Sequence, residues 1–394
     1  MGDRRAALTV GRNLLQDRSA VVGIGQTRFG KDFVESEEQL ACMAIKSALH
    51  DAGIDASEVD GLCTYTYQSA EEEEIARDLG FGDLTFFSRT PAGGGAGCGT
   101  VGHGTLAIAS GLANVVVAYR SRKRSSKASR LWMGTPPLVT RREMWQSPFG
   151  LLRPADQAAM LMRRYMHEFG ATREHLASIA CGIREHANRN PAAAMYSKSL
   201  SREQYFGARW ISDPLCLFDC CLESDGAAAV VLVSAERARD CRQAPAYVHS
   251  FAQGLSRESS MMFGYFGADP FRTQSWACAY RLWEFSDFKP ANIDVAQIYD
   301  AFSPEILFSL EGFGFCARGE AAGFIANGAV RLGGRLPINT SGGSLSEAYL
   351  HGFNLILEAV RQIRGTSTAQ VPNVQSSFVS SSDGVPTGAL LLRK

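Results

Sequence analysis

The chain has 394 residues, of which 45% are hydrophobic and 20% are charged, and its 40 basic residues balance its 40 acidic ones. This length and composition are typical of a protein with a large buried core, built as one big domain or as two fused ones. The balanced charge excludes a general attraction to nucleic acid or to an anionic membrane, so a charged partner needs a local site.

The ten cysteines include no Cys-x-x-Cys pair. This usage predicts reduced thiols rather than a disulfide framework or a zinc cage. No apolar run of signal-peptide length follows the charged N-terminus, and no stretch of about eighteen apolar residues occurs. We therefore expect a cytoplasmic protein without a membrane span and without a bound metal.

Strand and helix patterns alternate over the first 120 residues. Apolar runs predict strands, and apolar residues at helical spacing predict helices. The predicted elements are a strand at 20–30, a helix at 37–52, a strand at 59–67, a helix at 71–79, a glycine-rich turn leading into a helix over 93–112, and a strand at 114–119. This order predicts an α/β protein with layers of helix and largely parallel sheet.

The alternation lapses at about 120–211, where a basic loop and a long helical segment at 155–189 indicate an insertion that forms a lid or a substrate loop. It then resumes in a second series of elements. These are strands at 225–233, 247–252, 295–299 and 388–392, with helices at 276–285 and 346–364. The repeated order favours an internal duplication, with halves at 1–242 and 243–394.

Two motifs in the second half resemble the thiolase superfamily. The first is Gln297–Phe302, with the sequence QIYDAF, and the second is Asn339–Gly352, with the sequence NTSGGSLSEAYLHG. They are most similar to the sterol-carrier-protein-X branch, where the first motif reads His-Asp-Cys-Phe and the second ends in Gly-His-Pro. Tyr299 and Tyr349 stand where those motifs have histidines. The thiolase-like aldolases of steroid side-chain breakdown share this double replacement.

The resemblance implies a thiolase fold, with two repeated α/β halves in five layers, αβαβα. It also implies retro-aldol cleavage of a 3-hydroxyacyl-CoA, in which Tyr299 and Tyr349 act as a general acid and base pair with the two roles unassigned. A free tyrosine has a pKa of about 10, so the basic one needs a depressed pKa or a relay. Asp300, His351 and Asn339 are candidates for relay or support.

A glycine-rich stretch, Ala92–Gly99, corresponds to the elbow that carries the nucleophilic cysteine of thiolases. The elbow residue is Gly94 or Gly95, and Cys98 follows about one helical turn later. At a helix N-terminus, Cys98 would have a lowered pKa and could act as a nucleophile. Without a thiolate, the elbow glycines could instead form an oxyanion or phosphate site, or a tight turn.

Three further features bear on the reaction. Ser380–Gly384 stands where thiolases have a Cys-x-Gly loop, and no cysteine follows Cys316, so chemistry through an acyl-cysteine is disfavoured. The basic run at 120–130 contains Arg122 and Arg124, which could hold the phosphates of CoA. Gly342 and Gly343 of the second tyrosine motif are further candidates for substrate contact.

These observations favour an acyl-CoA carbon–carbon lyase that releases a ketone or aldehyde and acetyl-CoA or propionyl-CoA, without a cofactor beyond the CoA thioester of its substrate. Two alternatives stay open. One is a thiolase or acyltransferase that uses Cys98, and the other is a non-catalytic lipid or acyl-CoA binding subunit. The resemblance further implies a homodimer that associates with a small DUF35-type protein of OB-fold and zinc-ribbon character.

Overall fold

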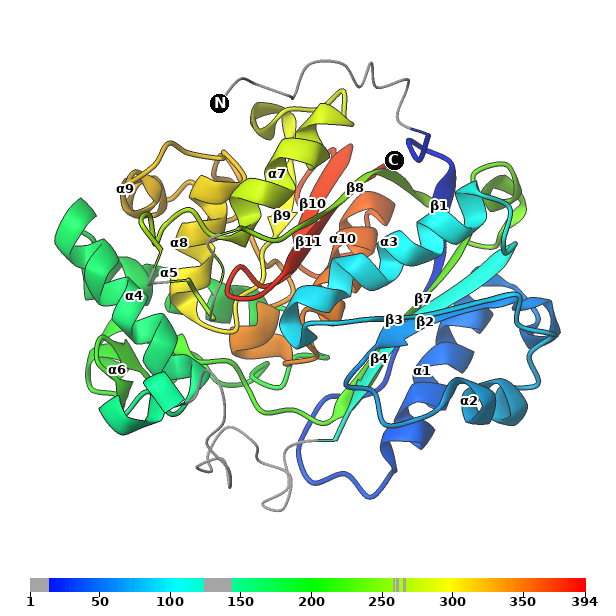
Figure 1. Ribbon diagram of the computed structural model, residues 1–394, viewed down its shortest axis with the longest axis horizontal. Coiled ribbons are helices and arrows are strands. Elements are labelled where there is room, and N and C mark those ends of the chain that lie inside the picture. The colour runs from blue at the N-terminus through cyan, green and yellow to red at the C-terminus, as the bar shows by residue number, and fades with distance from the viewer. Residues whose placement is uncertain (1–13, 124–143, 258, 260–261, 265–266) are drawn as a thin grey trace.

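The computed structural model describes residues 14–394, apart from 124–143, 258, 260–261 and 265–266. Most of its strands join one mixed sheet in the order β3-β2-β4-β7-β1-β8-β11-β10-β9 (Figure 1). They are β1 (Ser19–Gln26), β2 (Gly61–Tyr65), β3 (Phe86–Thr90), β4 (Val115–Arg122), β7 (Gly226–Ser234), β8 (Ala246–Gly254), β9 (Val295–Gln297), β10 (Ser376–Ser380) and β11 (Thr387–Arg393). Two short strands, β5 (Trp210–Ser212) and β6 (Leu215–Cys216), pair separately.

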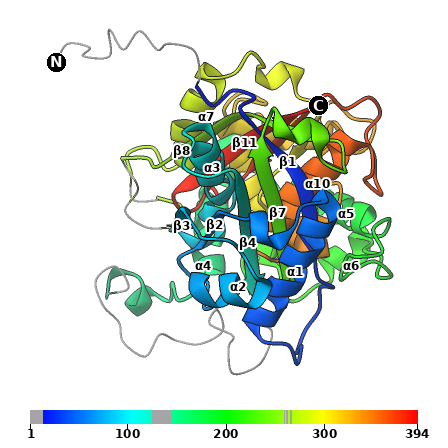
Figure 2. The ribbon, with the colours of Figure 1, turned by 90° about the vertical axis from the view of Figure 1, so that its right-hand side faces the viewer.

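The sheet has two groups of strands, β3-β2-β4-β7-β1 and β8-β11-β10-β9, which form two layers, and the helices form three further layers. The helices are α1 (Glu37–Ala52), α2 (Glu72–Leu79), α3 (Ala96–Ala109), α4 (Pro154–Phe169), α5 (Arg173–Ala187), α6 (Arg202–Phe206), α7 (Gln274–Glu284), α8 (Ser303–Gly312), α9 (Ala321–Ala326) and α10 (Phe353–Arg364). Helix α1 packs on β1, β4 and β7, whereas α7 packs on β8 and β11. Helix α3 contacts strands of both groups, and α10 contacts β7 as well as β9 and β10 (Figures 1 and 2). The order is therefore helix, sheet, helix, sheet, helix.

Three buried apolar clusters occupy the spaces between these layers. One lies between α1 and the first group of strands, a second surrounds the central helices α3 and α10, and a third lies between the second group of strands, α7, α8 and the inserted helices. The two groups of strands meet where Ala20 and Val21 of β1 pair with β8. The proposed division at residue 242 falls between β7 and β8 and stays a prediction.

Helix α3 is rich in glycine because it lies between two sheets. A Cβ atom on Gly102 would come within 2.2 Å of the ring of Phe251, and one on Gly104 would come within 3.0 Å of Leu232 and Val116. Real Cβ atoms do not approach so closely, so the glycines allow the helix to contact both sheets. This close packing fixes the start of α3, which is where the elbow lies.

Most of the predicted elements are present, with several differences. The predicted helix at 346–364 is the shorter α10, which follows a π-helical turn at Gly343–Glu347. The elements that were not predicted are β3, β5, β6, β10, α6, α8 and α9. The long helical segment at 155–189 is two helices, α4 and α5, because α4 ends at Gly170 in the left-handed conformation. Within the described residues, no helix is long and apolar enough to cross a bilayer.

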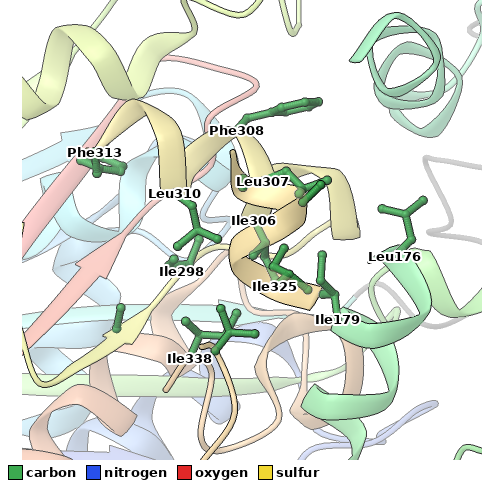
Figure 3. Close-up of a cluster of buried hydrophobic side chains, with 14 of the residues drawn as sticks. Leu176, Ile179, Ile298, Ile306, Leu307, Phe308, Leu310, Phe313, Ile325 and Ile338 are labelled. Carbon is green, nitrogen blue, oxygen red and sulfur yellow. The ribbon is translucent and has the colours of Figure 1, made fainter. Parts of the chain in front are cut away.

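The insertion forms part of the core of the second half. Strand β4 extends to Arg122, so the insertion begins later than the predicted residue 120. Helix α5 packs against α8, α9 and the π-helical turn. Figure 3 shows Ile179 of α5 close to Ile325 of α9 and Ile306 of α8, and Leu176 of α5 belongs to the same buried cluster. The inserted helices therefore support the segment that carries the second tyrosine motif, and the described part of the insertion is not a free lid.

Candidate active site

The two tyrosines of the motifs lie side by side. Tyr299 follows strand β9, and Tyr349 follows the π-helical turn. The Tyr299 hydroxyl donates a hydrogen bond of 3.0 Å to the Tyr349 hydroxyl, and the two rings meet edge to face with centroids 6.3 Å apart. Tyr299 is 1% exposed and Tyr349 is 8% exposed. The structure thus brings motifs fifty residues apart in sequence into one pair of hydrogen-bonded phenols.

Burial raises the pKa of both phenols above its usual value, because a buried phenolate loses its hydration. The depressed pKa that a tyrosine base needs is therefore not found in the free chain. The pair is nevertheless asymmetric. The cation of Arg122 and the hydrogen bond from Tyr299 both favour ionisation of Tyr349, whereas donating that hydrogen bond favours the protonated form of Tyr299. Tyr349 is the easier of the two to ionise.

The glycine-rich elbow packs directly against this pair. A short turn at Gly93–Gly95 leads into α3. A Cβ atom on Gly94 would lie 2.1 Å from the hydroxyl oxygen of Tyr299, and one on Gly95 would lie 1.7 Å from the carbonyl oxygen of Pro386. The Tyr299 hydroxyl therefore occupies the space that a side chain at Gly94 would need. This geometry is a tight turn, and contact of either glycine with substrate stays a prediction.

Cys98 packs its side chain against strand β10. Its backbone N–H donates to the Ser381 hydroxyl at 3.0 Å, and its sulfur lies 3.6 Å from the carbonyl oxygen of Val379 in β10. The side chain is buried, and burial raises the pKa of the thiol to about 12. The predicted lowering of this pKa at a helix N-terminus is wrong, because the loss of solvent outweighs the helix dipole.

Asp300 holds the second motif in place. Its carboxylate accepts hydrogen bonds from the backbone N–H groups of Ser344, at 2.7 Å, and of Leu345, at 3.3 Å. A Cβ atom on Gly343 would lie 2.2 Å from an Asp300 oxygen, so glycine there allows the carboxylate to approach. Burial raises the pKa of Asp300 to about 6, against the opposing effect of these hydrogen bonds. These contacts describe structural support, and they give Asp300 no path to a phenol.

Asn339 joins the two motifs through the backbone. Its side chain accepts from the N–H of Ile298 and donates to the carbonyl of the same residue, each at 2.7 Å. Gly342 has a φ of +112°, and a Cβ atom there would lie 2.7 Å from that of Ala187 in α5. Gly342 is therefore packed against the inserted helix. The predicted supporting role fits Asn339, whereas these contacts place Gly342 against protein.

Arg122 lies beside the tyrosine pair. Its side chain is buried, its guanidinium carbon lies 5.2 Å from the centroid of the Tyr349 ring, and Nη1 donates to Nε2 of His351. Because a guanidinium can only donate, Nε2 of His351 is the acceptor and the imidazole is neutral with its proton on Nδ1. The His351 ring contacts Tyr349 edge to face at 5.3 Å. This position does not fit the predicted contact of Arg122 with CoA phosphates, and Arg124 lies outside the described residues.

Comparison with known proteins agrees with this architecture. Residues 272–391 match the family described as thiolase C-terminal domain-like. The chain is 45% identical over 386 residues to the steroid side-chain-cleaving aldolase of Thermomonospora curvata, covering 96% of this chain and 99% of the relative. It is 44% identical over 386 residues to the 17-hydroxy-3-oxo-4-pregnene-20-carboxyl-CoA lyase of Mycobacterium tuberculosis, covering 96% of this chain and 100% of the relative.

The chain belongs to the thiolase-like aldolases of the thiolase superfamily. A solved structure of the Ltp2-ChsH2(DUF35) aldolase matches with a TM-score of 0.91 at 44% identity, over 97% of this chain and 99% of that chain. The resemblance inferred from the two tyrosine motifs is therefore confirmed, and so is the predicted thiolase fold.

The serines of residues 380–384, the loop that the sequence comparison placed at the second active cysteine of thiolases, bind both the backbone of the first tyrosine motif and a buried carboxylate. Ser380 accepts a hydrogen bond from the backbone N–H of Tyr299 at 3.3 Å. Ser382 donates to a carboxylate oxygen of Glu305 at 2.7 Å, and its own N–H donates to the carbonyl of Gly94 at 3.0 Å. This serine loop, 380–384, therefore ties together the first tyrosine motif, the elbow and the start of α8.

Three residues near the pair escaped the sequence interpretation. Tyr65 donates to the backbone carbonyl of His351 at 3.3 Å, and its ring stacks on the imidazole at 6.0 Å. Cys221 and Glu305 each act electrostatically on Tyr299 and Tyr349. Glu305 follows a Ser-Pro pair at a helix start, where a first-turn glutamate is ordinary. Glu305 is unusual because it is buried, and the local sequence contains no pattern that predicts this burial.

Proposed function

We propose that the chain is an acyl-CoA lyase that cleaves a 3-hydroxyacyl-CoA by a retro-aldol reaction. The supporting observation is the hydrogen-bonded pair Tyr299–Tyr349 beside an elbow whose Cys98 thiol is buried against strand β10. In the reaction, the 3-hydroxyl loses its proton, its oxygen becomes a carbonyl, and the C2–C3 bond breaks. The bonding electrons form the enolate of the acyl-CoA, which takes a proton at C2. The reaction moves one proton and consumes no reductant.

Tyr349 is the base in this proposal. It is the easier phenol to ionise, and its anion would be stabilised by the Arg122 cation and by the Tyr299 hydroxyl. The ionised Tyr349 accepts the proton of the substrate hydroxyl, and the Tyr299–Tyr349 pair then supplies the proton to C2 of the enolate. A phenol pair that shares one proton is suited to both steps, because the base in the first step becomes the acid in the second.

The substrate is a thioester with an extended apolar tail, of the steroid side-chain class. This part of the proposal is supported by the two relatives, which are described as a steroid side-chain-cleaving aldolase and as a pregnene-carboxyl-CoA lyase. The 44% identical solved structure is an aldolase that contains a DUF35 component, which supports a DUF35-type partner for this chain. We further propose a homodimer that works in the cytoplasm, where its ten free cysteines would stay reduced.

The thiolase alternative requires an exposed thiolate, and the buried thiol of Cys98 does not provide one. One experiment separates it from the lyase and from the non-catalytic binding subunit. The purified chain, with and without a DUF35-type partner, is incubated with a panel of 3-hydroxyacyl-CoA and 3-oxoacyl-CoA thioesters, and the products and the intact protein mass are measured. The lyase releases a ketone or aldehyde from a 3-hydroxyacyl-CoA with no acyl-enzyme. Stable acylation of the protein, or binding without turnover under every condition, would refute it.

A further inference from the structure

Glu305 is a buried carboxyl group beside the tyrosine pair that the reaction above does not use. It lies in the first turn of α8 and is 1% exposed. Its Oε2 atom accepts two hydrogen bonds, from the Ser382 hydroxyl at 2.7 Å and from the N–H of Asp383 at 3.1 Å. Among the described residues, no arginine or lysine forms an ion pair with it. A carboxylate buried without a cation is costly, so the group tends to hold a proton.

The two hydrogen bonds decide where such a proton sits. Because Oε2 accepts from both Ser382 and Asp383, it is the carbonyl-type oxygen of a protonated carboxyl, and the proton is on Oε1. Burial raises the pKa of Glu305 to about 8, and the negative charge of Asp383 adds to the effect. Glu305 is therefore mostly neutral at pH 7.

An ionised Glu305 would oppose the proposed chemistry. Its negative charge raises the pKa of both Tyr299 and Tyr349, although Arg122 acts in the opposite direction on Tyr349. The Arg122 cation would then have to balance the negative charges of a carboxylate and of a phenolate, so it would stabilise a developing enolate less. The titratable groups that interact with Glu305 come from several elements, and they are Cys221, Tyr299, Asp300, Tyr349 and Asp383.

We propose that Glu305 is a positioning residue that must stay uncharged for the tyrosine pair to work, with its proton held on Oε1 and its Oε2 fixed by Ser382 and Asp383. Its neutrality means that an ionised Tyr349, when it forms beside Arg122, is not opposed by a carboxylate charge on Glu305. The Glu305 proton is not consumed in the reaction. This inference rests on the proposed function, and it predicts that ionisation of Glu305 at alkaline pH lowers lyase activity relative to a variant that cannot ionise at this position.

The test compares the wild type with Glu305→Gln, whose amide oxygen can accept the same two hydrogen bonds but cannot ionise. We expect wild-type kcat/KM to fall relative to that of the variant as the pH rises through the Glu305 pKa, because the neutral fraction of Glu305 falls about tenfold for each pH unit above the pKa and the Tyr349 ionisation is common to both proteins. The ratio of variant to wild-type kcat/KM should therefore rise about tenfold between pH 7 and pH 9. A ratio that stays constant over this range would overturn the inference.

Glu311→Gln is the matched control, because Glu311 is a buried glutamate on the same helix whose carboxylate binds the Tyr165 hydroxyl and the N–H of Ala321. It should keep the wild-type pH profile. If Glu305→Gln does not fold, Ser382→Ala is the second variant. It removes a hydrogen bond that lowers the Glu305 pKa, so the alkaline loss of activity should move to higher pH. If the alkaline loss of activity in Ser382→Ala occurs at the same pH as in the wild type, the inference is again overturned.

Infrared difference spectra test neutrality without using activity. The spectrum of the wild type minus that of Glu305→Gln should show the carbonyl stretch of a protonated carboxyl group at pH 7, and the band should weaken about tenfold as the pH rises to 9. Absence of the band at pH 7 would refute the neutral Glu305. Failure of the proposed function is distinguishable, since it would appear as full lyase activity in tyrosine variants whatever the state of Glu305.

Discussion

On the Tyr349 side of the phenol pair stands a cation, with the Arg122 guanidinium 5.2 Å from the ring centroid and paired with His351. On the Tyr299 side lies the buried carboxyl group of Glu305, whose ionised form would raise the pKa of both phenols. One hydrogen bond of 3.0 Å connects the two sides. Two identical side chains in contact can therefore have different proton affinities, because the neighbouring charged or ionisable groups differ.

The two sides are also held by different chemistry. The motif of Tyr349 is anchored by Asp300, which accepts two backbone N–H groups from the π-helical turn. The motif of Tyr299 is anchored by hydroxyls of the serine loop, with Ser380 on its backbone and Ser382 on Glu305. Each carboxylate accepts two hydrogen bonds, and Asp300 has the lower pKa, about 6 against about 8 for Glu305, whose pKa is also raised by the charges of Asp383 and Asp300. Negative neighbours as well as burial therefore decide how readily a buried carboxyl ionises.

Removing the Tyr349 hydroxyl should have the largest effect on activity. Tyr349→Phe deletes the proposed base, and kcat should fall by about 10²–10⁴-fold, the usual contribution of a general base. Tyr299→Phe keeps Tyr349 and Arg122 and removes one hydrogen-bond donor, so its loss should be smaller. The measurement is the rate of acyl-CoA release from a 3-hydroxyacyl-CoA, with circular dichroism to confirm folding. Equal losses, or a larger loss for Tyr299→Phe, would contradict the assignment of the base.

Arg122 offers the next largest effect. Arg122→Gln removes the cation that favours ionised Tyr349, and we expect kcat/KM near neutral pH to fall by about 10–100-fold, corresponding to one or two pKa units. The acid limb of the pH profile should move to higher pH, because Tyr349 then needs a higher pH to ionise. Arg122→Lys keeps the charge and serves as the control, with a smaller shift of that limb. An unshifted limb in Arg122→Gln would show that Arg122 does not set the Tyr349 pKa.

The parts of the fold with a clear local pattern were predictable from the sequence. The apolar run of β4 and the helical spacing of α1 are examples. Strand β3 was missed because it lies at the edge of the sheet, where only one of its residues, Thr90, is buried. Helix α8 was missed because it is buried on all sides, so it has no polar face to give a helical period.

The candidate site, like the fold, could be predicted only where a local sequence pattern exists. Tyr299 and Tyr349 could be found because each lies in a motif, and the resemblance of the motifs carried the inference. The place of Arg122 beside Tyr349 depends on long-range packing between β4 and the second motif, which no local pattern encodes. Likewise, the raised pKa values of the Cys98 thiol and of Glu305 follow from burial by distant segments. Burial of this kind is a property of the whole fold.

Asp300→Asn tests the anchoring of the Tyr349 side. The amide can accept one of the two backbone hydrogen bonds but presents N–H to the other donor, which should cost about 1–3 kcal/mol of unfolding free energy. The pH dependence also changes. Because burial raises the Asp300 pKa from its usual 3.8 to about 6, the folded state keeps a proton that the unfolded state releases, and the group makes stability fall as the pH rises between these values.

Denaturant unfolding of Asp300→Asn between pH 4 and pH 7 should therefore show a smaller loss of stability with rising pH than the wild type. Glu58→Gln, which loses an exposed ion pair with Arg237, is the control and should unfold like the wild type. A pH dependence identical in Asp300→Asn and in the wild type would mean that Asp300 is ionised throughout this range.

Cys98→Ala should have the smallest effect on activity, and it sharpens the contrast between this site and a thiolase site. The sulfur faces the carbonyl of Val379 in β10, so its removal leaves Tyr299, Tyr349 and Arg122 in place. We expect kcat close to that of the wild type and a loss of about 1 kcal/mol in stability from the small cavity. Turnover with 3-hydroxyacyl-CoA and thermal unfolding are the measurements. Loss of turnover in a stably folded Cys98→Ala would place sulfur in the reaction, and the phenol pair could then no longer account for it alone.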